Sequence, residues 1–316
     1  MPNTLAHIAV QGPGTRALMR NAGFGWILLG CIIPDVPWIL LRAAGFALEL
    51  NPYDLRLYAI VQSSLVFCLV LSLFFASFSK TFLPVFGILA TGSLMHLLLD
   101  AMQTKWGNGV HLLAPLSWKL LGFHLFWPEN AVTYILTASG LVVFALQWRK
   151  ASFRMPDLVW RPVASTALAV AYLLLPALFL QGPAMADNHF VQTLRHVSDR
   201  AGKSVEMDRV RVSDHGGVLY VRTFAGEEIP VRGLSASSVG TVSLKGTFLE
   251  DNYLSVTRHH LHLPLYRDTA SILGLCLVTL YWIAPLWRGC RVKDEGKGAK
   301  EEADDSSDVT VSPPGP

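Results

Sequence analysis

The sequence predicts a mainly α-helical, polytopic membrane protein of about six spans, the first of them broken, with a small exported β-barrel-like domain inserted before the last span. Its 316 residues are 52% hydrophobic and only 16% charged, whereas soluble domains carry about 25% charged residues. The charges are also uneven. Residues 182–268 hold ten basic and ten acidic residues, while residues 1–181 hold eleven and six. This distribution indicates an apolar membrane part and one water-exposed insert.

Spans are recognised as apolar stretches of about 20 residues, the length that crosses the hydrocarbon core. A broken first segment covers residues 24–44, where Pro34 and Pro37 flank Asp35, and proline removes a backbone donor. Five uninterrupted segments follow, at residues 57–79, 82–100, 131–148, 163–181 and 269–287.

Orientation follows from the basic residues of short loops, which favour the cytoplasm. One cluster lies at residues 149–161 and another at 288–300, and exactly two spans separate them. Residues 182–268 are then periplasmic in a bacterial inner (cytoplasmic) membrane, and the N-terminal segment with Arg16 and Arg20 falls inside. The predicted domains are 1–181 in the membrane, 182–268 exported, 269–290 as the final helix, and 291–316 as a disordered cytoplasmic tail.

The exported block is expected to begin with an amphipathic helix and to continue as five short strands. The helix places Phe190, Val191, Leu194 and Val197 on one face. Strand-like runs separated by turn signals follow at residues 205–212, 218–224, 229–231, 241–248 and 253–258. Five short strands favour a small barrel similar to an OB-fold. Because the charges of this block balance, no nucleic-acid partner is expected.

The sharpest chemical signal inside the spans is His96 followed four residues later by Asp100. Side chains at i and i+4 share a helix face, and ionisable residues in spans are costly and usually functional. The pair could hold a metal ion, or it could form a hydrogen bond that only helps helices pack. Asp35 lies roughly 17 Å and His96 roughly 21 Å from the cytoplasmic starts of their segments. The two could meet in the outer half of the bundle, unless Asp35 merely caps a half-helix.

Two further histidines flank this group. His111 belongs to an exterior loop that begins shortly after Asp100, so it could fold back over the site. His7 opens a short N-terminal helix and would have to dip into the bundle to join the others. For both, a structural or solvated histidine is an equal alternative.

The remaining polar residues give weaker signals. His260 and His262 share one strand face and could bind a metal, but they adjoin the membrane, where histidines more often serve as interfacial polar residues. Glu129 is interpreted as a solvated surface residue. No GxSxG, P-loop, GxGxxG or HExxH motif is present.

The first 120 residues resemble the YdjM-like family of inner-membrane-associated metal-dependent hydrolases. The matching positions are His7, Pro34, Asp35, Gly92, His96, Asp100, Gly107, Gly109 and Pro115. Several family ligands are replaced: Pro37 and Trp38 stand where a second Asp and a His are expected, and Gln62 with Ser63 occupies the place of a His-rich element. The resemblance implies a membrane-embedded, metal-dependent hydrolase. With those ligands missing, one metal rather than two is expected.

The first functional hypothesis is a hydrolase with a divalent ion, Zn²⁺ given histidine and carboxylate ligands. Asp35, His96 and Asp100 would be its ligands and catalytic groups, and His7 or His111 would complete the set. Depth suggests a phosphoester or lipid-derived envelope substrate. A second hypothesis is a non-catalytic envelope protein that binds a protein partner through residues 190–262. A third, a transporter with a His–Asp proton relay, lacks an inverted repeat to support it.

Overall fold

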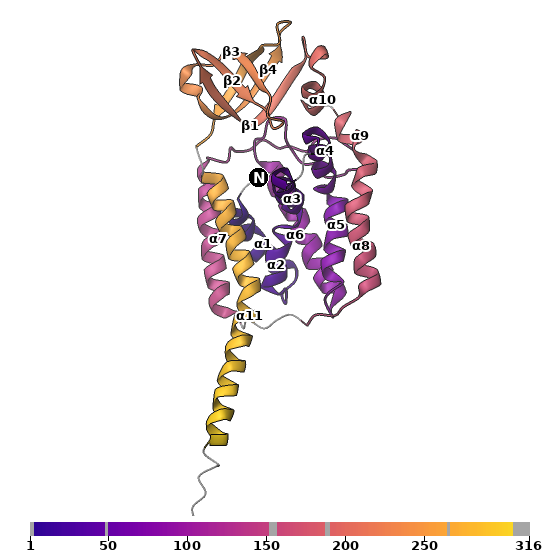
Figure 1. Cartoon of the computed structure of the whole chain (residues 1–316), viewed down its shortest axis with the longest axis vertical. Helices are drawn as coiled ribbons and strands as arrows, with labels where there is room; N and C mark the ends of the chain where they lie inside the picture. The colour runs from indigo at the N-terminus through magenta and orange to yellow at the C-terminus, as the bar shows by residue number, and fades with distance from the viewer. Residues whose placement is uncertain (1–2, 48–49, 152–156, 187–189, 264–265, 306–316) are drawn as a thin grey trace, which may run out of the picture.

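The computed structural model describes residues 3–47, 50–151, 157–186, 190–263 and 266–305. A helical bundle carries a β-barrel at one end, and the last helix extends from the other end (Figure 1). Within these residues, five helical segments are long and apolar enough to span a membrane, and a bent helix pair can supply a sixth span. The expected multi-pass bundle with one inserted barrel is confirmed.

The spanning helices follow the predicted hydrophobic segments closely. The uninterrupted helices are α6 (Phe82–Met102), α7 (Ala131–Lys150) and α11 (Tyr266–Asp305). The fifth predicted segment comprises α8 (Pro162–Leu174), the 3₁₀ turn η2 (Leu175–Phe179) and the short α9 (Gln181–Ala184). The helix change at η2 coincides with Pro176, which cannot donate to the helical ladder.

The first segment is interrupted where the prolines predict it. Helix α2 (Phe24–Gly30) leads into the 3₁₀ turn η1 (Ile33–Asp35), and α3 (Val36–Ala47) follows. The sharper break lies in the next segment, which the hydropathy pattern had predicted as continuous. There, α4 (Pro52–Gln62) and α5 (Leu65–Ala76) meet at 71°. The Ser63 hydroxyl donates to the carbonyl of Ile60 at 3.0 Å, and Ser64 has the extended conformation of an N-cap, so the serine pair ends one helix and begins the next.

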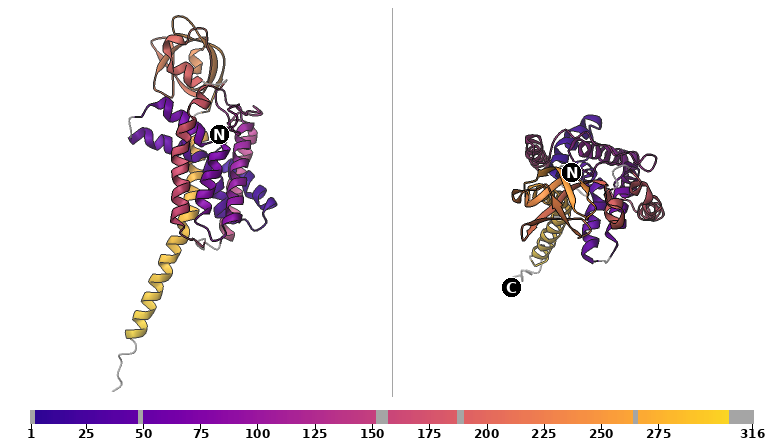
Figure 2. Two further views of the ribbon diagram at one scale, coloured as in Figure 1. Left: turned by 90° about the vertical axis from the view of Figure 1, so that its right-hand side faces the viewer. Right: turned by 90° about the horizontal axis from the view of Figure 1, so that it is seen from above.

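The N-terminal helix α1 (Thr4–Leu18) lies inside the bundle and begins at its barrel end (Figure 1 and Figure 2). The Asn3 amide donates to the Thr137 hydroxyl at 2.7 Å, near the start of α7. The Arg16 guanidinium donates to Gln147 at 2.6 Å, near the end of α7. Helix α1 therefore runs parallel to α7. Arg16 lies at the end of the bundle away from the barrel, on the side where the sequence placed it. The start of α1 lies at the barrel end, which corrects the expectation that the whole N-terminal segment lies on the side opposite the barrel.

Close backbone packing holds α1 between two helices from distant parts of the chain. A Cβ atom on Gly140 of α7 would lie 1.9 Å from the carbonyl oxygen of Leu5, so only glycine permits this approach. On the other side, the Thr4 hydroxyl donates to the carbonyl of Ser271 in α11 at 3.3 Å. These contacts fix the height of α1 in the bundle, and His7 with it.

The domain inserted before the last helix is a closed barrel of five strands in the order β1-β2-β3-β5-β4. Its strands are β1 (Ser204–His215), β2 (Val218–Arg222), β3 (Glu228–Arg232), β4 (Gly240–Phe248) and β5 (Leu254–Leu261). All neighbours are antiparallel except β3 and β5. The five strands were predicted, with boundaries that differ from the observed ones by up to three residues. Inward-facing residues such as Val221, Leu244 and Leu254 fill the barrel core.

Helix α10 (Phe190–Arg195) packs on this barrel core through Phe190, Val191 and Leu194. Val197, which was expected on the same face, is 52% exposed. The helix ends at Arg195, and residues 197–199 form a 3₁₀ turn (η3) that rotates Val197 away. A second short 3₁₀ turn, η4 (Ala236–Ser238), leads into β4.

The barrel is attached to the bundle through the loop that follows α6. The backbone N–H of Gly107 donates to Glu206 of β1 at 2.9 Å, and the Asn108 amide donates to Asp208 at 3.3 Å. Arg56 of α4 in turn donates to Asn108 at 2.8 Å. These contacts place the barrel directly over the end of the bundle where α1 begins.

Helix α11 continues well past the predicted final span. Its helical backbone extends from Tyr266 to Asp305, whereas the sequence had suggested a helix over 269–290 and disorder from 291. Residues 306–316, the rest of the expected disordered tail, lie outside the described residues. The lysine, glutamate and alanine residues after 290 are good helix formers. The prediction of disorder used only the overall charge and polarity of this stretch and therefore missed its helix propensity.

The packing at Gly140 predicts that Gly140→Val destabilises the fold. The new side chain would force α1 away from α7, and overpacking of this kind costs about 1–3 kcal/mol. We expect a lower thermal unfolding midpoint for the detergent-purified variant. Gly87→Ala is the matched control, since its Cβ would meet only the flexible end of Met19 at 3.1 Å. Equal unfolding midpoints for the two variants would show that the close contact between α1 and α7 at Gly140 does not limit the size of this side chain.

Candidate metal centre

Four ionisable side chains from three separate segments converge near the barrel end of the bundle. His7 comes from α1, Asp35 from η1, and His96 and Asp100 from α6. The Nε2 atom of His7 lies 3.6 Å from Oδ1 of Asp100, and that of His96 lies 3.6 Å from Oδ1 of Asp35 and 4.0 Å from Oδ2 of Asp100. Both imidazoles are fully buried. The predicted meeting of Asp35 and His96 is present.

The tautomer of His96 is fixed by a backbone contact. Its Nδ1 lies 2.8 Å from the carbonyl oxygen of Cys31, at the end of α2. A carbonyl oxygen can only accept, so Nδ1 carries the proton. In the neutral ring, the lone pair of Nε2 then points toward the carboxylates of Asp35 and Asp100. The separations exceed hydrogen-bonding distance, so this arrangement calls for a positive charge between the groups.

His7 is the fourth residue of this group, and its own ring nitrogens make no hydrogen bond with the described residues. Its imidazole stacks on that of His96, with ring centroids 3.6 Å apart and planes 8° apart. Among the described residues, neither ring nitrogen of His7 has a hydrogen-bond partner, and the same holds for Nε2 of His96 and Oδ1 of both Asp35 and Asp100. Buried polar atoms without partners are costly. Four of these atoms, Nε2 of the two histidines and one Oδ1 of each carboxylate, belong to the contacts described above, and a bound cation could satisfy them together.

The donor set fits a divalent transition metal. Ligand atoms of His7, His96 and Asp100 all lie within 4.8 Å of one another. Tetrahedral zinc, with bonds of about 2.0–2.2 Å, holds its ligands roughly 3.3–3.5 Å apart, so small side-chain rotations would complete the geometry. Asp35 lies next to His96 and can serve as a fourth ligand or as a base. Imidazole nitrogen and carboxylate oxygen are the ligand types that zinc prefers.

A lysine contributes the other charge of the centre. The ammonium of Lys105 lies 3.2 Å from Oδ2 of Asp100, and its side chain is nearly buried. With neutral histidines, the two carboxylates and Lys105 sum to one negative charge. A divalent ion would reverse that sign and would leave the centre attractive to an anionic group.

Gly92, one turn before His96, allows α6 to approach α2. A Cβ atom there would lie 3.1 Å from the Cα of Gly30 and 3.1 Å from Oε1 of Gln11. This close approach brings the Cys31 carbonyl against His96. Sequence reasoning pointed to Gly92 only through the family resemblance, since its partner Gly30 is distant in the chain.

The structure does not bring His111 to these four residues. Its Nδ1 lies 2.9 Å from the carbonyl oxygen of Trp118 within the same loop. A bridge between Val110 and Leu121 turns this part of the loop back on itself, so the loop closes locally instead of over the centre. Burial lowers the pKa of His111, although the bond to Trp118 acts in the opposite direction. His111 is thus a neutral, structurally engaged histidine.

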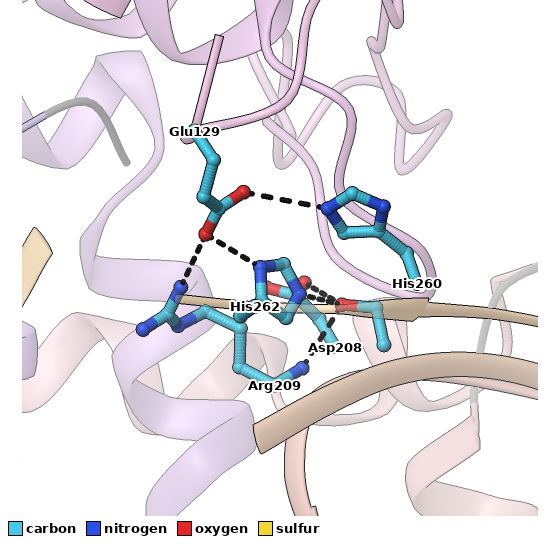
Figure 3. A network of polar contacts seen from close by, with 6 residues as sticks. Glu129, Asp208, Arg209, His260 and His262 are labelled. Carbon is cyan, nitrogen blue, oxygen red and sulfur yellow. Dashed lines mark hydrogen bonds and ion pairs between the residues drawn. The ribbon is translucent and has the colours of Figure 1, made fainter. Parts of the chain in front are cut away.

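A second group, formed by Glu129, His260 and His262, was not anticipated as a unit (Figure 3). Oε1 of Glu129 lies 2.9 Å from Nδ1 of His262, and Oε2 lies 3.4 Å from Nε2 of His260. The Glu129 side chain is 11% exposed, which corrects its interpretation as a solvated residue. The shared face of the two histidines was visible in the sequence, but a carboxylate 131 residues away was not.

The carboxyl of Glu129 is held ionised by these contacts. Burial alone would raise its pKa, but hydrogen bonds and charge interactions with His262 and His260 outweigh burial, and the pKa of Glu129 is lowered. Burial lowers the pKa of His260, and the bond to Glu129 offsets only part of that effect.

No family model, curated protein or solved structure matches this chain. The resemblance to the YdjM-like family stays a prediction from the motif residues.

The contact at Gly92 predicts that Gly92→Val weakens metal binding. Pushing α6 from α2 would separate the Cys31 carbonyl from Nδ1 of His96, and loss of such an orienting partner typically costs 10–100-fold in metal affinity. Zinc titration of metal-stripped protein would measure the change. Gly23→Ala, at the far end of α2, is the control because its Cβ makes only an ordinary contact with Trp26. Unchanged affinity in Gly92→Val would show that the carbonyl does not orient His96.

Proposed function

We propose that this protein is a membrane-embedded, metal-dependent hydrolase that acts on a lipid-derived or envelope phosphoester. The observation that carries the proposal is the fixed tautomer of His96. Its Nδ1–H is committed to the Cys31 carbonyl, so its Nε2 lone pair faces two buried carboxylates. A divalent ion is the group that would satisfy these atoms together with His7.

Each residue of the centre has a distinct role in this proposal. His7, His96 and Asp100 are the ligands, because their donor atoms lie closest together. Bound zinc supplies Lewis acidity that makes water nucleophilic near neutral pH. Asp35 acts as general base, since its side chain is the most solvent-accessible of the four in the centre and its Oδ1 has no hydrogen-bond partner among the described residues.

Lys105 and the neighbouring loop support the proposed substrate class. The Lys105 ammonium, 3.2 Å from Asp100, would bind a phosphoryl oxygen better than a neutral acyl group. The same loop, between α6 and α7, exposes large apolar side chains, including Leu113, Leu125 and Leu116, the last at 91%. Exposed leucines beside a membrane bundle favour contact with acyl chains. Together these features favour an amphipathic substrate with an anionic head.

The charge distribution supports placing this centre on the periplasmic side of a bacterial inner membrane. Arg149 and Lys150 end α7 at the side opposite the barrel. By the positive-inside rule, that side is cytoplasmic and the barrel is exported. The centre, near the barrel end, would then open toward the periplasmic leaflet.

One observation favours the second function, a non-catalytic envelope protein that binds a partner through residues 190–262. Gln62, at the place where the resembled family has a histidine-rich element, serves packing instead. Its amide donates to the Tyr172 carbonyl at 3.0 Å and to the Tyr58 hydroxyl at 3.1 Å. A centre in which residues such as Gln62 replace the family's metal ligands and stabilise helix packing could still bind a metal ion without catalysing hydrolysis.

The hydrolase proposal predicts loss of metal and activity together. His96→Ala and Asp100→Asn should each lose the ion of this centre, measured as zinc per chain after purification in detergent. Hydrolysis of a lipid phosphoester in mixed micelles should fall by about 10²-fold or more, since general acid–base and metal contributions are of that order. His215→Ala, on the exposed face of β1, should match the native protein.

Two results would decide against catalysis. Zinc bound equally by native and His96→Ala protein would remove the metal centre from the account. The partner-binding function would be favoured by two observations together. The native protein would bind zinc but hydrolyse no phosphoester or ester in micelles, and variants of the barrel surface, but not Asp100→Asn, would show a phenotype.

A further inference from the structure

The junction between the barrel and the bundle contains a continuous chain of polar side chains (Figure 3). Glu129, in the loop just before α7, contacts His262, just after β5. The other ring nitrogen of His262, Nε2, lies 2.7 Å from the hydroxyl oxygen of Ser243 on β4. That hydroxyl lies 2.7 Å from Oδ1 of Asp208 on β1. Three strands of the barrel and one membrane loop therefore meet at His262, which is almost fully buried.

Hydrogen-bond accounting fixes which nitrogen of His262 carries a proton. The Ser243 hydroxyl donates to the carboxylate of Asp208, which can only accept. It already accepts from the backbone N–H of Arg209 at 3.1 Å. The remaining contact to Ser243 must then be a donation from Nε2 of His262. With Nε2 donating to Ser243, the 2.9 Å contact of Nδ1 with the Glu129 carboxylate is a second donation, made by the ring that carries both protons. A divalent ion that replaced the Nδ1 proton would bind the lone pair of that nitrogen and the carboxylate oxygen together.

His260 presents a second nitrogen to the same carboxylate. Its ring stacks on Trp127, with centroids 3.9 Å apart and planes 8° apart, which holds Nε2 toward Oε2 of Glu129. Arg209 contacts Oε1 at 3.5 Å, and Figure 3 shows it approaching from the other side of the carboxylate from His260. The guanidinium therefore lies on Oε1, and Oε2 contacts His260 on the opposite side of the carboxylate.

We propose that Glu129, His260 and His262 form a second divalent-metal site, which ties the barrel to the membrane bundle. The donor atoms of the three residues lie within 4.8 Å of one another, and the observed contacts of 2.9 and 3.4 Å bracket the roughly 3.3 Å between ligands of tetrahedral zinc. Two histidines and one glutamate are an established zinc set.

The surrounding residues give this site the second shell that metal-binding histidines require. Such histidines usually donate their other N–H to a carboxylate or carbonyl, which fixes the ring and raises its basicity. Here the path from Nε2 of His262 runs through Ser243 to the carboxylate of Asp208. The stacked ring of Trp127 orients the imidazole of His260. The ligands come from β5 and from the loop before α7, so an ion bound there joins the two parts of the protein.

Zinc stoichiometry of the full-length, detergent-purified protein tests this proposal independently of the first centre. After metal stripping and equilibrium dialysis against zinc, the His96→Ala protein should retain one tightly bound ion per chain. Adding Glu129→Gln or His262→Ala to that background should abolish this ion. Adding His259→Ala should not, because the side chain of His259, which precedes the pair on β5, has Ser238 as a hydrogen-bond partner at 3.4 Å and does not belong to the group of three possible ligands.

Ser243→Ala supplies a readout in which all three proposed ligands are kept and only the hydrogen-bond partner of His262 is removed. Loss of the orienting hydroxyl should raise the zinc Kd of the His96→Ala protein by about 10–100-fold. Cobalt substitution should give a visible d–d spectrum that is lost in Glu129→Gln. Glu129 lies outside the barrel core, so this variant reports on the site even where His262→Ala fails to fold.

The outcomes separate the two sites. No ion in the His96→Ala background, or an ion that survives both Glu129→Gln and His262→Ala, overturns the junction site and indicates an ion pair without metal. One ion in both native and His96→Ala protein, lost in Glu129→Gln, supports the junction site while removing the first centre.

Discussion

The cost of burying two carboxylates in an apolar bundle is the constraint on which this structure depends. Asp35 and Asp100 lie among helices that otherwise present leucine, isoleucine and phenylalanine. Water can solvate such groups only weakly there, so their charge must be balanced by neighbours. Lys105 and the two stacked imidazoles do part of this. The remaining unpaired lone pairs make a bound cation the simplest way to complete the balance.

Close helix contacts supply the geometry that this balance needs. The glycine at 92 lets α6 reach α2, and the glycine at 140 lets α7 reach α1. Each contact positions one imidazole: the first sets the Cys31 carbonyl against His96, and the second fixes the height of His7. The loop after α6 then connects the centre to the barrel through Gly107 and Asn108. Positioning of the site is therefore a property of the whole bundle.

The sequence was sufficient for features that depend on local periodicity. Apolar runs located the spans, alternation located the five strands, and the spacing of His96 and Asp100 placed both on one face. It failed where distant contacts decide. Helix α1 carries polar residues and has modest hydropathy, so only its packing against α7 and α11 shows that it lies inside the bundle. For the same reason Glu129 was missed as a partner of His262, and the local closure of the His111 loop was not foreseen.

The position of α1 links completion of the chain to completion of its chemistry. His7 is translated long before two of the helices that hold α1, namely α7 on one side and α11, which begins at Tyr266, on the other. A nascent polypeptide that lacks α11 can pack α1 against α7 but leaves the opposite side of α1 uncovered. During biogenesis, α1 can therefore complete its packing only after α11 has been translated, and a product that ends before α11 would hold His7 less firmly.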